Sequence, residues 1–367
     1  MDKCNEKKGT SGMRYYGCYY IEHFHLNFNG MNGHQSNNKA GCIEFCCLSL
    51  APGIGFFDSI DNTIKSLIKK RSEIIMENKA FGNDNIIDKN TSKCAKCPYF
   101  KEMKGTGDGF VHFININMYP APCQSKCIYC GVHNSELGIF DKEQYAEIYE
   151  KMFQVIKMCL EKGMIAEDAV WQVASGEITI HPYKDRIFEI IKNKNVKILT
   201  NVFIFDEKIA DILNTNICSS INLSIDSGTP ETWHKVKGVN NFSTVIDNLS
   251  KYSASCLRPE QITLKYIMLP GINDNVVDFQ GVIQIMKRLK INKISISRDN
   301  RFRIEKLIIY NSSRFKDKPR KEQYSPTDKA IECFSKELKK NNMIAERAVS
   351  WPDDYEEEER RLLESEK

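Results

Sequence analysis

Short apolar runs alternate with amphipathic segments through the middle of the chain, between about residues 107 and 300. Each run is bounded by polar turn residues and is rich in Val, Ile and aromatic side chains, which is the pattern of a buried strand. Six such runs occur: FVHFININMY (110–119), AVWQVA (169–174), VKILTNV (196–202), INLSID (221–226), ITLKYIML (262–269) and KISIS (293–297). The pattern therefore predicts six strands in this part of the chain.

Amphipathic helices are predicted in the intervals between these strands. In the clearest of them, at 141–163, apolar side chains recur at helical spacing and Gly163 ends the helix. Its apolar face consists of Ile148, Met152, Val155, Ile156 and Cys159. Further helices are predicted at 183–193, 205–213, 242–255 and 275–290. Six strand–helix repeats imply an α/β fold, a parallel sheet with its helices outside. A six-stranded open barrel and a doubly wound sheet both fit this pattern.

The chain on either side of these repeats differs from them in regularity and composition. Residues 1–106 are irregular, hold seven of the fourteen cysteines and contain one predicted helix at 59–78. Residues 301–367 are more polar, with a helix predicted at 325–340. We therefore expect three parts: a cysteine-rich N-terminal region at 1–106, a core at 107–300 and a small polar C-terminal extension at 301–367.

Composition and charge exclude several classes of protein. The net charge of +4 is small for 367 residues, so no specific nucleic-acid partner is expected. No stretch approaches the roughly 18 apolar residues of a membrane span, and the N-terminus lacks the apolar core of a signal peptide. We therefore expect a cytoplasmic protein without membrane contact. In that compartment, fourteen cysteines indicate thiolate metal sites, of zinc or iron–sulfur type, rather than disulfides.

Three of these cysteines stand in the sequence CQSKCIYC, directly after the first predicted strand. For fourteen cysteines placed at random, about 0.02 triplets with this spacing would be expected, so Cys123, Cys127 and Cys130 are informative together. Such a loop can wrap three thiolates around three corners of an iron–sulfur cluster and leave the fourth iron open to another ligand. The alternative is a zinc knuckle completed elsewhere, for example by His133.

The loop resembles that of the radical SAM (S-adenosylmethionine) superfamily, in which a CxxxCxxC loop has an aromatic residue before its last cysteine, as Tyr129 stands here. The resemblance implies a partial (β/α)6 barrel whose active site lies at the carboxyl ends of the strands, in keeping with the six repeats. It also implies two cofactors, SAM and a [4Fe–4S] cluster held by Cys123, Cys127 and Cys130.

Polar segments at later strand ends extend the resemblance. Ser175-Gly176-Glu177 resembles the family's GGE motif, which binds the amino group of SAM, and a carboxylate is a suitable acceptor for an ammonium. The segment SIDSG follows the fourth strand, the PGIND turn follows the fifth and SISRDN ends the sixth. The resemblance assigns further contacts with SAM to Ser224, Asp226, Lys265 and Ser297.

The N-terminal cysteines form two groups that could close one four-thiolate site, namely Cys42, Cys46 and Cys47 with Cys94 and Cys97. Three interpretations remain: an auxiliary iron–sulfur cluster, a structural zinc site and unligated thiols. Auxiliary clusters in the family usually lie after the barrel, which leaves the subfamily open. The remaining cysteines in the core and C-terminal part are expected to be ordinary thiols: Cys159, Cys218, Cys256 and Cys333.

The resemblance implies an enzyme in which one-electron reduction of the cluster cleaves SAM to a 5′-deoxyadenosyl radical that abstracts hydrogen from a substrate. A flavodoxin or ferredoxin would supply the electron, and the enzyme would be an oxygen-sensitive oxidoreductase. An auxiliary cluster would favour a peptide or protein substrate. The alternatives are an enzyme acting on a small metabolite, sugar or nucleotide and, more remotely, a non-catalytic zinc or iron–sulfur protein.

Overall fold

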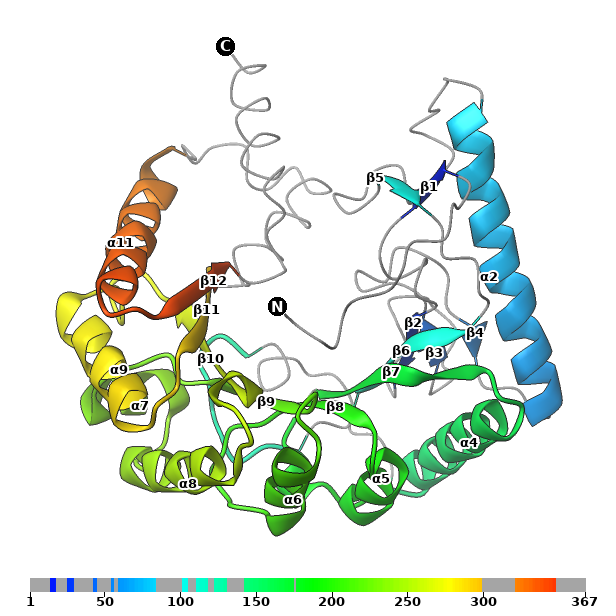
Figure 1. The fold of residues 1–367 in the computed structure, drawn as a ribbon, viewed down its shortest axis with the longest axis horizontal. Coiled ribbons are helices and arrows are strands. Elements are labelled where there is room, and N and C mark those ends of the chain that lie inside the picture. The colour runs from blue at the N-terminus through cyan, green and yellow to red at the C-terminus, as the bar shows by residue number, and fades with distance from the viewer. Residues whose placement is uncertain are drawn as a thin grey trace.

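A curved, mainly parallel β-sheet with helices along its outer face forms the body of the structure (Figure 1). This computed structural model describes the residues 14–17, 25–29, 42–44, 54–55, 59–83, 101–104, 110–117, 122–130, 142–174, 176–298 and 321–347. Seven strands cross the sheet in chain order, each parallel to the next. They are β6 (Val111–Asn117), β7 (Ile165–Ala174), β8 (Asn195–Leu199), β9 (Ser220–Ser224), β10 (Ile262–Met268), β11 (Lys293–Arg298) and β12 (Ile344–Arg347).

The strand order decides between the two architectures that periodicity left open. A doubly wound sheet reverses its order at a switch point, whereas the order from β6 to β12 never reverses. The sheet is therefore wound in one direction, as in a barrel, and its described strands leave it open between β12 and β4. The predicted α/β fold with a partial barrel is confirmed, and all six predicted strands are present as β6 to β11. Strand β12 was not predicted.

Strands from the N-terminal region extend the same sheet beyond β6. Strand β2 (His25–Asn29) is parallel to β6, and β3 (Cys42–Glu44) and β4 (Ile54–Gly55) continue the sheet in antiparallel fashion. Two further strands, β1 (Arg14–Gly17) and β5 (Lys101–Lys104), pair with each other. The boundaries at 106 and 300 stay predictions, although the sheet is continuous across both.

The helices follow the predicted strand–helix alternation. Those between successive strands are α4 (Lys142–Glu161), α5 (Lys184–Ile191), α6 (Glu207–Thr215), α7 (Pro230–Lys237), α8 (Phe242–Ser255) and α9 (Val276–Arg288), with 3-10 turns η2 (Ile178–Ile180) and η3 (Pro259–Gln261). The N-terminal helix α2 (Ile60–Asn83) and α11 (Lys321–Lys340) were also predicted, but α7 was not. None of the helices in the described part is long and apolar enough to cross a bilayer.

Side-chain caps fix where several of these helices begin. Asp206 accepts a hydrogen bond from Lys208 N–H at the start of α6, and Asn275 accepts one from Asp278 N–H at the start of α9. Each such cap stabilises its helix by about 1 kcal/mol relative to alanine. The loops before these helices lie at the carboxyl ends of strands β8 and β10, so the caps also fix the loops that surround the expected active site.

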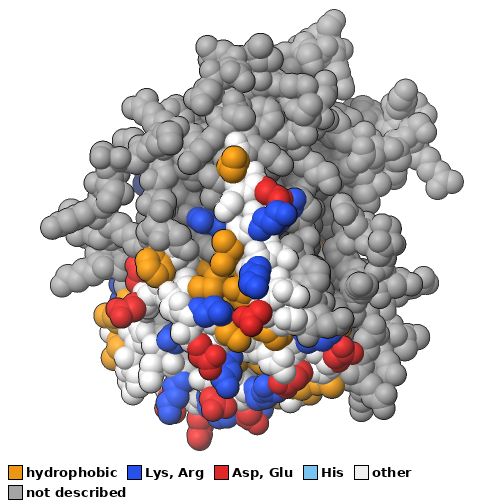
Figure 2. Space-filling view, turned by 90° about the vertical axis from the view of Figure 1, so that its right-hand side faces the viewer, with side chains coloured by type: hydrophobic (Ala, Val, Ile, Leu, Met, Phe, Trp, Pro, Cys, Tyr) orange, Lys and Arg blue, Asp and Glu red, His pale blue; other side chains and the backbone are white. Residues whose placement is uncertain are grey.

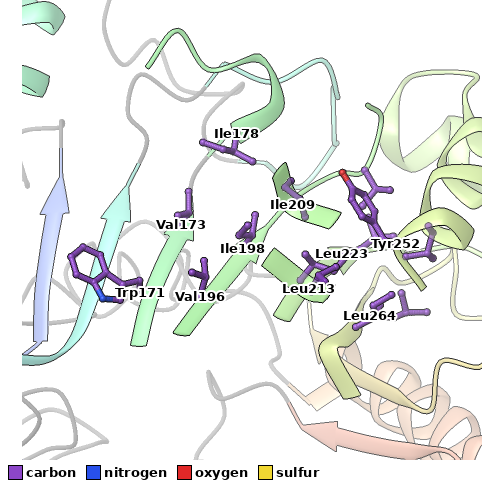
Figure 3. Packing of buried hydrophobic residues seen from close by; sticks show 14 of the residues in the cluster. Trp171, Val173, Ile178, Val196, Ile198, Ile209, Leu213, Leu223, Tyr252 and Leu264 are labelled. Atoms are coloured by element: carbon purple, nitrogen blue, oxygen red, sulfur yellow. The ribbon is translucent and has the colours of Figure 1, made fainter. Parts of the chain in front are cut away.

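The core lies between the sheet and the helices on its outer face. Figure 3 shows side chains from β7, β8, β9, β10, η2, α6 and α8 packed together there, including Trp171, Val173, Ile178, Val196, Ile198, Ile209, Leu213, Leu223, Tyr252 and Leu264. Full burial of an aliphatic or aromatic side chain contributes about 1.5–3 kcal/mol. The predicted apolar face of α4 belongs to this core, because Ile148, Met152, Val155, Ile156 and Cys159 are all buried.

The described surface on the α2 and α4 side carries charges of both signs without a single-sign field (Figure 2). Ion pairs such as Lys151–Glu147 at 2.8 Å and Lys162–Asp61 at 3.6 Å account for part of this mixing. Exposed pairs of this kind contribute little to stability. The mixed surface agrees with the small net charge.

Two glycines allow α9 to pack backbone-to-backbone against the loop after β9. A Cβ atom on Gly281 would lie 2.3 Å from Gly228 O, and one on Gly228 would lie 2.1 Å from Asp278 O. The Asp278 carboxylate strengthens this contact by accepting hydrogen bonds from Gly228 N–H at 2.8 Å and from Thr232 Oγ1 at 2.9 Å. The SIDSG segment is therefore also a packing motif, in which glycine permits the close approach.

The contact predicts that Gly281→Ala destabilises the protein. Alanine in a helix interior normally stabilises it by about 1 kcal/mol relative to glycine, but here the added methyl meets backbone atoms, and overpacking costs about 1–3 kcal/mol or more. Urea denaturation should show a lower free energy of unfolding. Gln284→Ala, on the exposed side of the same helix, is the control and should change it by less than about 0.5 kcal/mol. A stabilised Gly281→Ala variant would contradict the close contact.

A buried histidine predicts a loss of stability in acid. His181 Nδ1 accepts a hydrogen bond from Tyr183 N–H, and its Nε2 lies 2.8 Å from Tyr149 Oη. Burial lowers the pKa of His181 from 6.5 to about 4. Below pH 6.5 His181 therefore binds a proton in the unfolded chain, but in the folded protein it stays neutral until about pH 4. The free energy of unfolding thus falls as the pH falls through this window.

This single group should reduce the free energy of unfolding by about 2 kcal/mol between pH 8 and pH 5. The measurement is urea denaturation of the wild type and of His181→Gln at both pH values. Glutamine does not titrate, so the variant should lose less stability than the wild type over this range. Equal losses in the two proteins would show that His181 is not the responsible group.

Candidate functional site

The three thiols of the CQSKCIYC segment are free and partly exposed, in a loop after β6 that the structure describes at residues 122–130. Asn201 Nδ2 donates a hydrogen bond to Cys123 Sγ at 3.4 Å, and Ser125 Oγ lies 2.9 Å from Cys127 Sγ. Burial raises the pKa of the Cys123 thiol, and hydrogen bonds from Ser125 N–H and from Asn201 lower it. The donors around these sulfurs favour the thiolate, which is the form that binds metal.

Backbone contacts fix this loop against the end of α7. Lys126 N–H donates to Lys237 O at 2.8 Å, and Ile128 N–H donates to Val236 O at 3.0 Å. Gly238 ends α7 with φ = +71°, and a Cβ atom there would lie 2.9 Å from the Lys126 side chain. Glycine therefore both ends the helix in the left-handed conformation and leaves room for the cysteine loop.

A buried ion pair holds the aromatic residue of the loop. Lys237 Nζ lies 2.6 Å from Asp226 Oδ2, and both side chains are almost fully buried. Tyr129 Oη donates to the same Asp226 oxygen at 2.5 Å and accepts from Lys237 Nζ at 2.7 Å. Burial, followed by the charge of Asp226, raises the pKa of Tyr129 well above its ordinary value, so its hydroxyl remains a donor. Asp226 Oδ1 accepts from Ile267 N–H at 2.6 Å.

The PGIND turn completes this network from β10. Asn273 is fully buried, and its Nδ2 donates to Asp226 O and to Ile267 O, both at 2.8 Å. Its Oδ1 accepts from Leu269 N–H at 2.7 Å. Asp226 has φ = +48°, a left-handed conformation that Asp tolerates better than most residues, and the hydrogen bond to its carbonyl holds it there. The turn thus fixes the backbone on which the ion pair depends.

Glu177, the acid of the predicted SAM motif, is fully buried. Its carboxylate accepts hydrogen bonds from Thr179 N–H and Oγ1, from Thr200 Oγ1 and from Asn201 N–H at 2.6–3.1 Å. Burial raises the pKa of this carboxyl, and donors from Asn201 and Thr179 oppose the rise. Glu177 N–H also donates to Pro122 O at 2.8 Å, which joins the motif to the cysteine loop. The carboxylate thus has its partners within the protein.

The other predicted SAM contacts lie on neighbouring strands. Ser224 on β9 pairs in register with Lys265 on β10, and Ser297 on β11 pairs with Ile267. Among the described residues, Lys265 Nζ has no ion-pair partner, and burial lowers its pKa while the charge of Asp226 opposes that change. Gly176 lies just beyond the end of β7, and Ser175 falls outside the described residues. Direct contacts of Glu177 and Asp226 with SAM stay predictions, although both carboxylates are already hydrogen-bonded.

The residues around the loop fit a cluster with a polar ligand beside it. Three thiolates are the soft ligands that iron–sulfur clusters take. Among the buried polar atoms that lack partners within the described part are Gln124 Nε2 beside Cys123 and Ser297 Oγ at the end of β11. A buried polar atom without a partner is costly, so its presence at this edge of the sheet agrees with a bound polar molecule. Within the described ranges, no three His, Cys, Asp or Glu side chains are grouped as ligands for a single ion.

The N-terminal cysteines are placed only in part. Cys42 begins β3 and pairs in register with Asn29 of β2, which in turn pairs with Asn117 at the end of β6. With strands about 4.8 Å apart, the backbone of Cys42 lies about 10 Å across the sheet from the end of β6. The other predicted ligands fall outside the described residues, as does His133: Cys46, Cys47, Cys94 and Cys97.

The remaining cysteines mostly follow the prediction. Cys159, Cys256 and Cys333 are free. Cys218 is disulfide-bonded, so its prediction as an ordinary thiol was wrong.

Two residues of the site were missed from the sequence. Lys237 lies on α7, and the signals for that helix were present: Thr229 as its N-cap, Pro230 in its first turn and Gly238 after its end. Asn201 carries no motif signal. It reaches Cys123 only because β8 ends beside the cysteine loop, which is a consequence of strand order and not of local sequence.

Comparison with solved structures gives partial likenesses. Streptococcus suis SuiB bound to precursor peptide SuiA matches with 13% sequence identity and a TM-score of 0.46, over 87% of this chain and 57% of that one. A radical SAM methyltransferase from Sphaerobacter thermophilus matches with 13% identity and a TM-score of 0.42, over 62% of this chain and 63% of that one. This chain thus spans less than two thirds of either protein. Both TM-scores lie below 0.5.

Comparison with protein families gives a match over part of the chain. No curated protein matches the chain significantly. Residues 121–281 match the family model described as the Radical SAM superfamily, and this segment runs from the cysteine loop to α9. The cofactors of that superfamily are SAM and a [4Fe–4S] cluster, which is the predicted pair. Over residues 121–281 the chain is therefore similar to the Radical SAM superfamily.

Proposed function

We propose that this enzyme holds a [4Fe–4S] cluster through Cys123, Cys127 and Cys130 and uses it to cleave SAM. The observation that carries the proposal is the cysteine loop, which presents three free thiols and is fixed through buried polar contacts of Tyr129. When bound, such a cluster supplies the electron that splits SAM into methionine and a 5′-deoxyadenosyl radical, which abstracts hydrogen from the substrate. We propose a flavodoxin or ferredoxin as the electron donor.

The chain's own residues would bind and orient SAM. The ammonium of Lys265, which has no ion-pair partner among the described residues, is suited to a carboxylate, because a charged hydrogen-bond partner stabilises a half-buried cation strongly. Ser224 and Ser297 lie on the two strands that flank β10, and their hydroxyl groups are suited to the adenosine or ribose. The backbone at Gly176 is the candidate for the amino group. Glu177 and Asp226 would act by holding the surrounding loops in place.

A peptide or protein is the substrate class that we favour. Its support is the cysteine-rich N-terminal region, in which Cys42 lies on the sheet close to the end of β6 and so on the side of the cysteine loop. That position suits an auxiliary cluster. A small metabolite, sugar or nucleotide is the second candidate and would be favoured if the N-terminal site holds zinc or no metal.

Replacing all three cysteines of the loop by alanine should abolish SAM cleavage. The measurement is 5′-deoxyadenosine formed after anaerobic reconstitution with iron and sulfide, followed by dithionite and SAM. The wild type should form it, and the triple variant should form none. Cys333→Ala, which removes an exposed thiol on α11, is the control and should match the wild type.

Metal analysis of the same proteins tests the remaining alternatives. Wild-type protein that contains zinc and forms no 5′-deoxyadenosine would overturn the proposed function. In the triple variant, about four retained irons per chain would identify an auxiliary cluster. Zinc or no metal in that variant would favour the small-molecule substrate.

Lys265→Met should weaken binding of SAM without loss of the cluster. A hydrogen bond to a charged group contributes about 1.5–3 kcal/mol, so Kd should rise about tenfold to a hundredfold. Anaerobic equilibrium dialysis of reconstituted enzyme measures Kd directly. Lys293→Met, at the far end of the adjacent strand and paired with Glu346, is the matched control. An unchanged Kd for Lys265→Met would remove this residue from the SAM site.

A further inference from the structure

We propose that Asn201 is a positioning residue that raises the reduction potential of the cluster by donating a hydrogen bond to Cys123, and that Glu177 holds Asn201 in place. The inference rests on the proposed function, because it requires a cluster on the cysteine loop. Asn201 belongs to none of the sequence motifs, and its role would be in electron transfer. The carboxylate of Glu177 would then hold Asn201 and would not bind SAM.

The orientation of the Asn201 amide is determined by its other contacts. Oδ1 accepts a hydrogen bond from Phe203 N–H at 2.9 Å, two residues along the chain. Nδ2 therefore points the other way, where it donates to Cys123 Sγ at 3.4 Å and to Gln124 Oε1 at 3.0 Å. A flipped amide would place oxygen against both acceptors. The hydrogen-bond network thus assigns the N–H group, and not the carbonyl, to the sulfur.

Glu177 connects the donor to the thiol. Its Oε2 accepts from Asn201 N–H at 2.6 Å, and both of its oxygens accept from Thr200 Oγ1 at 2.9 and 3.0 Å. Its own N–H donates to the carbonyl of Pro122, the residue before Cys123. One buried residue thereby fixes the position of the amide from the end of β8 relative to the thiol after β6. This requires no contact between the carboxylate and SAM.

A hydrogen bond to a ligand sulfur changes the energies of the two oxidation states unequally. Reduction adds negative charge to the cluster and its thiolates, and an N–H donor stabilises that charge more strongly in the reduced state. The site is partly buried, so the dipole is screened less than it would be in water. Ser125 N–H also bonds Cys123, but that donor belongs to the cysteine loop itself. Asn201 is the donor that a side-chain substitution can remove.

Two substitutions distinguish an effect of Asn201 on the reduction potential of the cluster from its contact with the backbone at Phe203. Asn201→Asp keeps an oxygen that accepts from Phe203 N–H but has no N–H group for the sulfur. Asn201→Leu removes both interactions. Asn195→Asp, at the opposite end of β8 and half-buried, adds the same charge far from the cysteine loop and is the matched control.

The measurement is the midpoint potential of the reconstituted cluster, from a redox titration followed by electron paramagnetic resonance, with iron per chain counted in parallel. Both Asn201 variants should keep the wild-type iron content. In each, the ratio of reduced to oxidised cluster at the wild-type midpoint should be roughly tenfold lower, which is a shift of about 59 mV to more negative potential for one electron. Asn195→Asp should keep the wild-type potential.

The outcomes distinguish this inference from the proposed function. Wild-type protein without an iron–sulfur cluster would overturn both. A cluster whose potential is unchanged in Asn201→Asp would overturn the tuning role alone, because it would show that Asn201 serves only the turn at Phe203. If Asn201→Leu loses iron, Asn201→Asp decides the question. Loss of iron in both variants would also overturn the inference, since it would make Asn201 necessary for assembly of the cluster and not for its potential.

Discussion

The buried ion pair between Lys237 and Asp226 is the interaction on which the geometry of the site depends. A buried charge is costly unless its partner and its remaining hydrogen bonds are well placed, and removing one member of such a pair costs about 3–5 kcal/mol. Here the Asp226 carboxylate has its hydrogen bonds, because Tyr129 Oη and Ile267 N–H donate to it beside Lys237. The pair joins α7, the loop after β9 and the cysteine loop. Its position therefore fixes the thiols relative to the sheet.

A second set of contacts reaches the same loop from the other side. Glu177 bonds to the backbone before Cys123 and to the residues after β8, and Asn201 extends that contact to the sulfur. The cysteine loop is thus held by buried polar groups from both directions. Polar networks of this kind define one arrangement when every member is satisfied. In the proposed function such restraint would hold a radical close to its substrate, and small displacements of reacting groups carry a large cost in rate.

Packing of α9 on the outer face of the sheet stabilises the loop after β9, which carries Asp226. The contact between Gly228 and Gly281 brings α9 against the loop that carries Asp226, and the carboxylate of Asp278 fixes the loop backbone. The segments SIDSG and PGIND therefore have a structural explanation that is complete without a ligand. Among the described residues, polar groups left for a ligand include Lys265 Nζ and Ser297 Oγ on the strands β10 and β11.

The sequence by itself determined the six strands, most of the helices and the place of the cysteine loop after the first strand, because these depend on local periodicity, on caps and on cysteine spacing. It could not choose between a barrel and a doubly wound sheet, since both repeat the same local unit and differ only in strand order. The roles of Lys237 and Asn201 were likewise decided by tertiary structure, which brings residues 237 and 201 to a loop at 122–130. Burial also changed the interpretation of Glu177 and Asp226 from ligands of SAM to residues that hold neighbouring loops in place. The oxygens of both carboxylates are already hydrogen-bonded within the protein.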